Sequence, residues 1–212
     1  MKERGMIFNG EMVRAILDGR KTQTRRPVKF PILDRNLGCE LAGNELAGEL
    51  SAGNYLNSAF GKPGDRIWVR EAFRVHSRAT DVATLVYKAS ERNSWTEQTH
   101  RVPVAVCNKP ATPEKWTPSL HMPRWASRIL LEITDVRVER LNSIHDVDAM
   151  REGIQNLTTC SHADFGIPGV VNSQHPVRAF QLLWESIYGD ESWQENPWVW
   201  VIEFKRVEGG AA

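Results

Sequence analysis

Two segments in which apolar and polar residues alternate constrain the fold of this chain most strongly. Residues 128–141 form the longest such segment and residues 197–204 the next, and both patterns predict β-strands. Shorter strand patterns occur at residues 66–76, 82–89 and 101–106. Helical periodicity occurs at residues 9–18, 145–152 and 176–188. Because strands and helices do not alternate regularly, we expect an α+β fold around a small, partly closed β-barrel rather than a doubly wound sheet.

Residues typical of helix ends delimit the three predicted helices. Asn9 is the expected N-cap of the first helix, and Gly19 is the glycine that ends it. Ser143 is the expected N-cap of the second helix, which Gly153 ends. Pro176 stands in the first turn of the third helix, where its missing N–H group is tolerated. All three helices therefore have at least one boundary that the sequence defines.

Two irregular segments are predicted as insertions into a single domain that spans residues 1–212. Residues 34–62 are rich in Gly, Asn, Ala and Leu and predict one short helix, whereas residues 90–115 are polar and contain prolines. A Lys-Pro-Gly-Asp turn at residues 62–65 precedes the 66–76 strand. The pattern of that strand shifts phase near Glu71, which predicts a β-bulge that redirects a side chain.

The composition excludes several classes of protein. The chain has 212 residues, of which 41% are hydrophobic and 25% charged, which is typical of a globular domain. Its net charge of +1 gives no overall field that would attract nucleic acid. No apolar segment resembles a signal peptide or a membrane span, so we expect a cytoplasmic protein without a membrane partner. Dispersed histidines and three distant cysteines (Cys39, Cys107 and Cys160) predict neither a metal site nor a disulfide framework.

The densest group of reactive side chains is the basic segment, residues 19–26, with the sequence GRKTQTRR. A threonine hydroxyl becomes a useful nucleophile only when a neighbouring base accepts its proton, and Lys21 is three residues from Thr24. Lysine acts as a base near neutral pH only when burial or nearby cations lower its pKa from about 10.4. Arg25 and Arg26 are such cations and are also candidate ligand contacts. The segment is therefore a candidate site for a polar or anionic ligand.

Glu71 is the candidate partner of the basic segment. The strand that carries it is expected to pair beside residues 20–26, where its carboxylate would orient Lys21, transfer a proton or bind an amino group of a ligand. The same residues also fit a simpler interpretation, in which Lys21 and Glu71 form a surface ion pair and Thr24 is an ordinary strand residue. Spacing alone leaves both interpretations open.

A second candidate constellation is the segment WTPSLHMPRWASR at residues 116–128. Its aromatic rings and guanidinium groups suit the stacking of a base or the binding of a phosphate. The candidate ligand contacts here are Trp116, His121, Arg124 and Trp125, to which Trp68 of the 66–76 strand is added. Alternatively, the tryptophans fill the edge of a core and the arginines are solvated. The segment at residues 193–198 is interpreted as a turn anchored by tryptophan.

These motifs resemble those of the ASCH domain family, which has a PUA-like fold. The matching segments are residues 19–26, residues 63–71 (PGDRIWVRE), residues 116–128 and residues 196–204. The last two are similar to the longer, phage- and prophage-associated branch of the family. The resemblance covers nearly the whole chain and implies a small β-barrel with flanking helices and a cleft lined by the G-x-K-x-x-T-x-R segment. It also implies binding of RNA or nucleotide bases.

The resemblance further implies an activity and its residues. A short bacterial member of the family is an amidohydrolase that removes the acetyl group from N4-acetylcytidine with a lysine, a threonine and a glutamate. Matching the motifs places these roles on Lys21, Thr24 and Glu71. The resemblance implies no metal or organic cofactor. This chain is about twice as long as that member, which leaves the acyl group, the nucleoside and the role of residues 34–62 undetermined.

The leading hypothesis is therefore hydrolysis of the amide of an N4-acylated cytosine nucleoside. Thr24 would attack the acyl carbonyl, Lys21 would take its proton and Glu71 would assist the departing amine. The rival hypothesis is an RNA-binding protein or ribonuclease that uses the same basic cleft, and a further alternative is a phage accessory protein without chemistry. The near-neutral net charge favours a nucleoside-sized partner over a long nucleic acid. Oligomeric state does not follow from the sequence.

Overall fold

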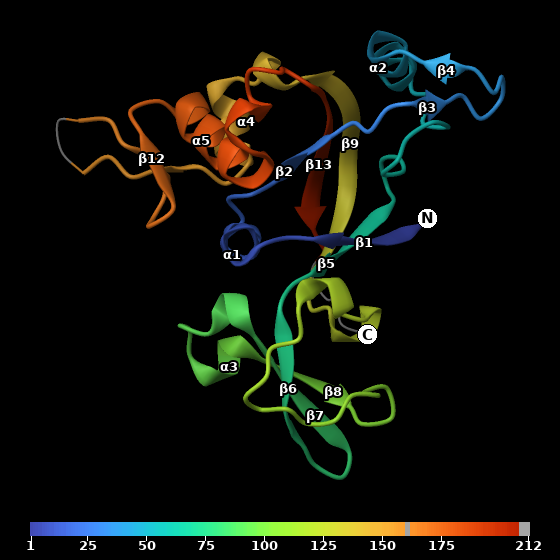
Figure 1. Ribbon diagram of the computed structural model, residues 1–212. Coiled ribbons are helices and arrows are strands. Elements are labelled where there is room, and N and C mark those ends of the chain that lie inside the picture. The colour runs from blue at the N-terminus through green and yellow to red at the C-terminus, as the bar shows by residue number, and fades with distance from the viewer. Residues whose placement is uncertain (160–161, 208–212) are drawn as a thin grey trace. The chain divides into compact units, whose positions relative to one another are not determined.

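The computed structural model describes residues 1–159 and 162–207 and has an α+β fold with several separate sheets (Figure 1). The α+β class predicted from the sequence is thereby confirmed. The chain forms two compact units. Among the described residues, the first unit comprises Met1–Asp18, Arg66–Glu132, Arg206 and Val207, and the second comprises Gly19–Asp65 and Ile133–Lys205. The single domain expected from the sequence stays a prediction.

The first unit begins with strand β1 (Glu3–Ile7) and helix α1 (Gly10–Leu17). β1 pairs in parallel with β5 (Arg66–Arg70), and β5 pairs antiparallel with the first residues of β9 (Leu130–Arg140). The Asn9 side chain accepts a hydrogen bond of 2.8 Å from the Met12 N–H group, which confirms its role as N-cap of α1. Gly19 has a φ angle of +74°, as expected of a glycine that follows a helix.

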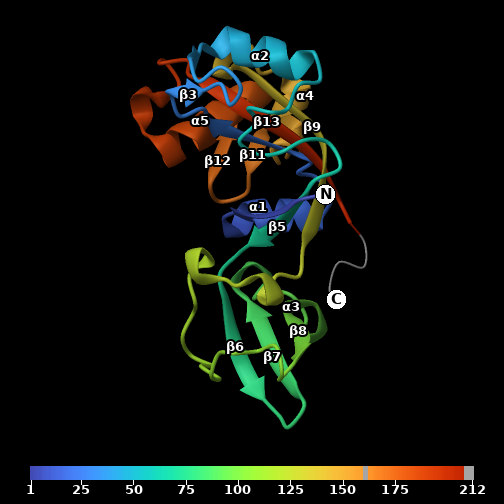
Figure 2. The ribbon, with the colours of Figure 1, turned by 90° about the vertical axis from the view of Figure 1, so that its right-hand side faces the viewer.

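A second sheet of the first unit contains β6 (Phe73–Arg78), β7 (Val82–Tyr87) and β8 (Thr99–Pro103), all antiparallel (Figure 2). A short helix, α3 (Trp95–Gln98), precedes β8. The sequence predicted one strand over 66–76 with a bulge near Glu71, and this is wrong. The chain leaves β5 after Arg70 and enters β6 at Phe73 in a different sheet, while the irregular register lies between Val75 and Ser77. Glu71 thus lies in the connection between two sheets.

Buried side chains from this second sheet and from the 116–128 segment form the core of the first unit. The buried members of the core are Phe73, Val75, Ala83, Leu85, Tyr87, Val102, Cys107, Met122 and Ala126. Tyr87 also donates a hydrogen bond of 2.8 Å from its hydroxyl to the Ala126 carbonyl oxygen. The buried hydroxyl therefore has a partner, which removes the cost of burying it.

The second unit contains a sheet in which β13 (Trp198–Arg206) lies between β9 and β2 (Gln23–Pro27). β2 and β13 are antiparallel, with Thr24 opposite Ile202 and Arg26 opposite Trp200. The basic segment therefore pairs with β13, and the expected pairing with the strand before Glu71 is wrong. Because side chains alternate along a strand, Thr24 and Arg26 lie on one face of β2 and Arg25 lies on the other.

Helices α4 (Asp146–Arg151) and α5 (Pro176–Tyr188) pack beside β13 and β2 in the second unit (Figure 1). A small sheet of β10 (Gln155–Asn156), β11 (Phe165–Ile167) and β12 (Val171–Ser173) connects them. The shared core contains Leu141, Ile144, Ala149, Ile154, Ile167, Ala179, Phe180, Leu183, Trp184, Val199 and Val201. Ser143 is not the N-cap of α4, because residues 141–143 form a 3-10 turn and His145 occupies the cap position. α5 has the predicted bounds and begins at Pro176.

The predicted 34–62 insertion does contain one short helix, α2 (Gly43–Ser51), preceded by a hairpin of β3 (Ile32–Leu33) and β4 (Glu40–Leu41). The turn at residues 62–65 is confirmed by a hydrogen bond of 3.0 Å from the Asp65 N–H group to the Lys62 carbonyl oxygen and by the φ angle of +88° at Gly64. Gly43 lies so close to the Trp198 indole that a side chain there would collide with the ring. No helix within the described ranges combines the length and the apolar character needed to cross a bilayer.

Candidate functional site

The Lys21 side chain of the basic segment has no exposed surface. Its Nζ atom donates hydrogen bonds of 2.8 Å both to the Glu152 carbonyl oxygen and to Glu152 Oε2. The neighbouring Thr22 N–H group donates to the Arg151 carbonyl oxygen at 2.9 Å, which ties the segment to the end of α4. Burial lowers the pKa of the Lys21 amine, and the Glu152 carboxylate opposes this shift.

Glu152 joins Lys21 to a larger buried ion network. Its Oε1 atom accepts a hydrogen bond of 3.2 Å from Arg25 Nη1, and Arg25 Nη2 lies 2.6 Å from Glu139 Oε1 and 3.5 Å from Asp148 Oδ2. The Arg25 side chain is fully buried. A buried charge is tolerated only when partners of the opposite sign compensate its lost hydration. The first function of Arg25 is therefore to balance this acidic cluster.

Arg137 extends the same network to the edge of the sheet. Its guanidinium contacts Glu139 at 3.3 Å and Glu203 at 2.6 Å, and it lies 3.7 Å from Asp148. These hydrogen bonds and charges raise the pKa of Arg137, although its partial burial acts in the opposite direction. We call Lys21, Glu152, Arg25, Glu139, Asp148, Arg137 and Glu203 the ion network, of which the first three residues are buried. It connects β2, β9, β13 and the end of α4 within the second unit.

The network changes the interpretation of the Lys21–Thr24 pair. Thr24 is buried. In the described part of the chain, both hydrogen-bond partners of the Lys21 amine are atoms of Glu152, and Thr24 is not one of them. Sequence reasoning missed Glu152 altogether. Glu152 stands just before Gly153, so the sequence places an acidic residue at the end of a predicted helix. Nothing in the sequence pairs this residue with Lys21.

Glu71 has a separate set of partners in the first unit. Only 2% of the residue is exposed, and its two carboxylate oxygens accept hydrogen bonds of 2.9 and 3.1 Å from Arg128. Arg128 also donates to Ser90 Oγ at 2.8 Å and stacks over the Tyr87 ring at 4.0 Å. Burial raises the pKa of the Glu71 carboxyl, and the Arg128 guanidinium opposes this shift. Because Lys21 lies in the second unit, its predicted meeting with Glu71 stays a prediction.

Glu71 also lines a cavity of about 360 Å³ in the first unit. The wall includes the cationic residues Arg14, Lys88 and Arg92 together with Glu91. Arg14 has internal partners, because its Nη1 atom donates a hydrogen bond of 2.8 Å to the Ala89 carbonyl oxygen. Both signs of charge therefore surround this cavity, and one of its carboxylates is already held by Arg128.

The tryptophans of the 116–128 segment contact the protein itself. The Arg74 guanidinium lies over the Trp116 ring, 4.5 Å from its centre. Trp125 packs edge-on against Phe73, with 6.3 Å between the ring centres, and borders the core of the first unit. These contacts agree with the interpretation in which the tryptophans fill the edge of a core.

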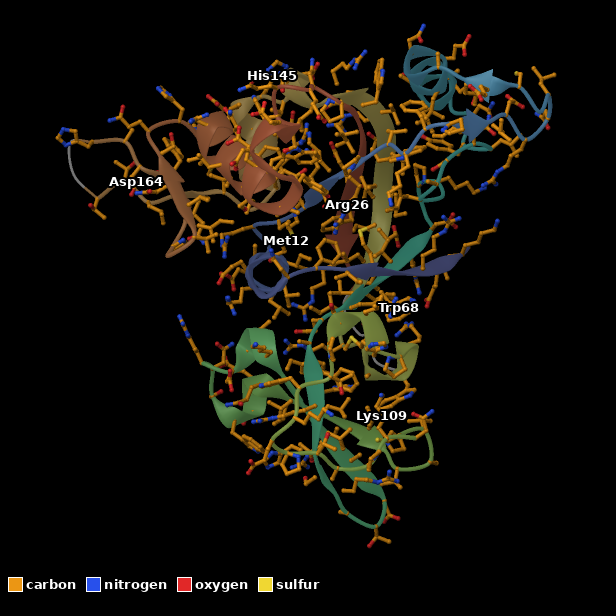
Figure 3. The ribbon with its side chains drawn as sticks, viewed as in Figure 1. Met12, Arg26, Trp68, Lys109, His145 and Asp164 are labelled. Carbon is orange, nitrogen blue, oxygen red and sulfur yellow. The ribbon has the colours of Figure 1, made fainter. Side chains whose placement is uncertain are left out.

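The other predicted ligand contacts in the first unit lie at its surface. The Trp68 ring on β5, labelled in Figure 3, is covered by Arg70 at 5.4 Å. Arg124 is not simply solvated, since its Nε atom donates a hydrogen bond of 3.0 Å to Glu3 Oε2. His121 is exposed at the end of a 3-10 turn. None of these positions is contradicted as a ligand contact, and all of them stay predictions.

The 193–198 segment is a turn anchored by tryptophan, as predicted. Trp193 packs against Phe180 with 6.2 Å between the ring centres, and Arg140 stacks over Trp198 at 4.5 Å. Asn196 has a positive φ angle of 44° in this turn. Its Oδ1 atom accepts a hydrogen bond of 2.9 Å from the Asn142 N–H group, which ties the turn to the end of β9.

The chain gives no match to a family model, to a curated protein or to a solved structure. The likeness to ASCH domains therefore rests on the sequence motifs quoted above.

Cys39 is exposed and Cys107 is buried, whereas Cys160 lies outside the described residues. Within residues 1–159 and 162–207, no group of three or more His, Cys, Asp or Glu side chains is arranged to hold a metal ion.

Proposed function

We propose that this protein is an amidohydrolase that removes the acyl group from N4-acylated cytosine nucleosides and that its fold is PUA-like. The observation that carries the proposal is the fully buried Lys21 amine, whose pKa is lowered by burial and which lies three residues before a buried threonine. A lysine whose pKa is lowered by burial loses its proton more readily than an exposed lysine, and its neutral amine can then accept a proton from a neighbouring group.

The reaction proceeds in two balanced steps. Thr24 Oγ1 attacks the acyl carbonyl carbon while the neutral Lys21 amine takes the hydroxyl proton, and the departing N4 amine is protonated as its C–N bond breaks. Water then hydrolyses the acyl-threonine ester and releases the carboxylic acid. Glu71, a buried carboxyl of raised pKa, is the proposed donor to the leaving amine. Arg26 or backbone N–H groups of the basic segment stabilise the oxyanion.

Glu152 adds a requirement to this mechanism. The Lys21 amine donates to two Glu152 oxygens, so it must turn from at least one of them to receive a proton from Thr24. Glu152 is therefore proposed as a positioning residue that holds the amine and exchanges protons with it. Without the Glu152 carboxylate, Lys21 would lose the charge that favours its protonated form.

The salt bridges favour a nucleoside over RNA as the partner. The RNA hypothesis assigns phosphate contacts to Lys21, Arg25, Arg26, Arg124 and Arg128. Four of these cations form salt bridges with carboxylates, at 2.6–3.0 Å for the shortest contact of each. A cation that already balances a carboxylate releases few counterions when it meets a phosphate, and this weakens the electrostatic term on which RNA affinity depends.

The test is to incubate purified protein with N4-acetylcytidine and to follow the release of cytidine by liquid chromatography. We expect Thr24→Val to lower the rate by about 100-fold or more, because it removes the nucleophile at nearly constant volume. Thr22→Val is the matched control, since Thr22 is exposed in the same segment. Comparing Glu71→Gln with Glu152→Gln separates the contributions of the two carboxylates to the rate of cytidine release. A wild-type protein that releases no cytidine, or a Thr24→Val variant with the wild-type rate, would overturn the proposal.

A further inference from the structure

A second cavity, of about 440 Å³, lies wholly within the second unit and shares only Arg26 with the residues assigned to the proposed hydrolysis. Its wall contains three aromatic residues, Phe60, Tyr188 and Trp200, and two cationic residues, Arg26 and Lys29. Its volume falls within the range of about 300–1,000 Å³ that is typical of small-molecule pockets. We propose that this cavity binds a planar aromatic anion, which is either a nucleotide or an aromatic carboxylate.

The aromatic residues come from distant parts of the chain; two of them contact each other, and the third packs against a tryptophan outside the cavity wall. Phe60 packs edge-on against Trp200, with 5.8 Å between the ring centres and an angle of 72° between the rings. Tyr188, at the end of α5, packs against Trp184 with 4.3 Å between the ring centres and an angle of 38° between the rings. Tyr188 is nevertheless 38% exposed, so part of its ring remains available to a ligand. Fixed aromatic side chains stack well on planar rings because they lose little conformational entropy.

The charges of the wall select an anion. Arg26 lies directly opposite Trp200 in the β2–β13 pairing and is labelled in Figure 3, and Lys29 follows two residues after the end of β2. Lys29 is exposed, and no carboxylate is among the residues that line this cavity in the described part of the chain. The cavity beside Glu71 differs in this respect, because it contains two glutamates. The charged side chains of the described wall are thus both cations, which favours a negative group on the ligand.

The cavity can be tested by binding alone, without any turnover. Isothermal titration calorimetry with AMP, adenosine, ribose 5-phosphate and benzoate separates the contributions of the ring and the charge. We expect AMP or benzoate to bind, and we expect adenosine and ribose 5-phosphate to bind at least about 5-fold more weakly than AMP if the nucleotide is the ligand. Binding of AMP would identify the ligand as a nucleotide, and binding of benzoate alone would identify it as an aromatic carboxylate.

Variants locate the binding in the cavity. Tyr188→Ser should weaken the bound probe about 5-fold or more through lost stacking, and Lys29→Gln should weaken it about 2- to 5-fold in a salt-dependent way. Lys115→Gln is the control, because Lys115 is an exposed lysine of the first unit. Binding of neither AMP nor benzoate overturns the inference, as does an affinity that both Tyr188→Ser and Lys29→Gln leave unchanged. Cytidine release by Thr24 variants is a separate measurement, so the two proposals fail independently.

Discussion

Replacing Glu152 with glutamine should destabilise the protein strongly, because it removes one charge from a fully buried pair. The Lys21 side chain has no exposed surface, and the carboxylate of Glu152 lies 2.8 Å from its amine. Loss of one partner from a buried ion pair costs about 3–5 kcal/mol. For a chain of this length, 1 kcal/mol lowers Tm by about 2–4 °C, so Glu152→Gln should lower Tm by about 6–20 °C.

The loss of stability caused by Glu152→Gln should also depend on pH in a defined direction. Burial holds the pKa of Lys21 below its value in the unfolded chain, so the unfolded chain binds more protons between the two values. Stability therefore rises with pH in this window and levels off above about 10.4, the pKa of an unperturbed lysine. In Glu152→Gln the carboxylate no longer raises the pKa of Lys21, so the window is wider and the deficit relative to wild type narrows as the pH rises.

Thermal unfolding followed by circular dichroism measures both effects. Glu195→Gln is the control, because Glu195 is an exposed residue of the same unit and its loss should change stability by less than about 0.5 kcal/mol. Adding Lys21→Met to Glu152→Gln should recover part of the loss, since no uncompensated amine then remains buried. A Glu152→Gln variant that unfolds at the wild-type temperature, or a double variant that recovers nothing, would refute this reasoning.

Three further predictions concern packing, capping and the reaction. Gly43→Ala should lower the free energy of unfolding, measured in urea, by about 1–3 kcal/mol, because the added carbon collides with the Trp198 ring. Gly48→Ala is the control: the added carbon there meets open space, so the free energy of unfolding should rise by up to about 1 kcal/mol. Equal effects of the two substitutions would contradict this prediction. Asn9→Ala should cost about 1 kcal/mol in the same assay, and Asn9→Ser should retain most of it. The initial rate of N4-acetylcytidine hydrolysis should rise with pH as Lys21, whose pKa is lowered, loses its proton, and it should fall as Glu71 loses the proton that it donates; a rate that does not change with pH is the opposing result.

Local sequence signals predicted elements well where a single segment contains all the information. Helix α5 has the predicted bounds because Pro176 starts it and a continuous apolar stripe buries its inner face. The same approach failed at Glu71, since a strand that changes sheets and a strand with a bulge give the same shift in pattern. It also failed at Ser143, because this residue lies in a 3-10 turn and does not cap α4.

The candidate site was predictable only in part, because its partners are distant in the sequence. The density of charge at residues 19–26 identified Lys21 and Arg25 as special, and both are buried. Their carboxylate partner Glu152 is 131 residues from Lys21, and a charge pattern on one segment does not specify such a pairing. Strand pairing poses the same problem, since the alternation in residues 197–204 predicts a strand but not its neighbour β2.

The pairing of β2 with β13 has a consequence for synthesis on the ribosome. Gln23 lies opposite Glu203 in this pair, so about 180 residues of chain must be made before the second strand exists. At roughly 5–20 residues per second, β2 waits about 10–35 s for its partner. During this interval Arg25 within β2 and Lys21, two residues before the strand, are hydrated, and their charges keep this part of the chain polar. The charges that are costly to bury in the folded protein thus protect an unpaired strand from aggregation while the chain is incomplete.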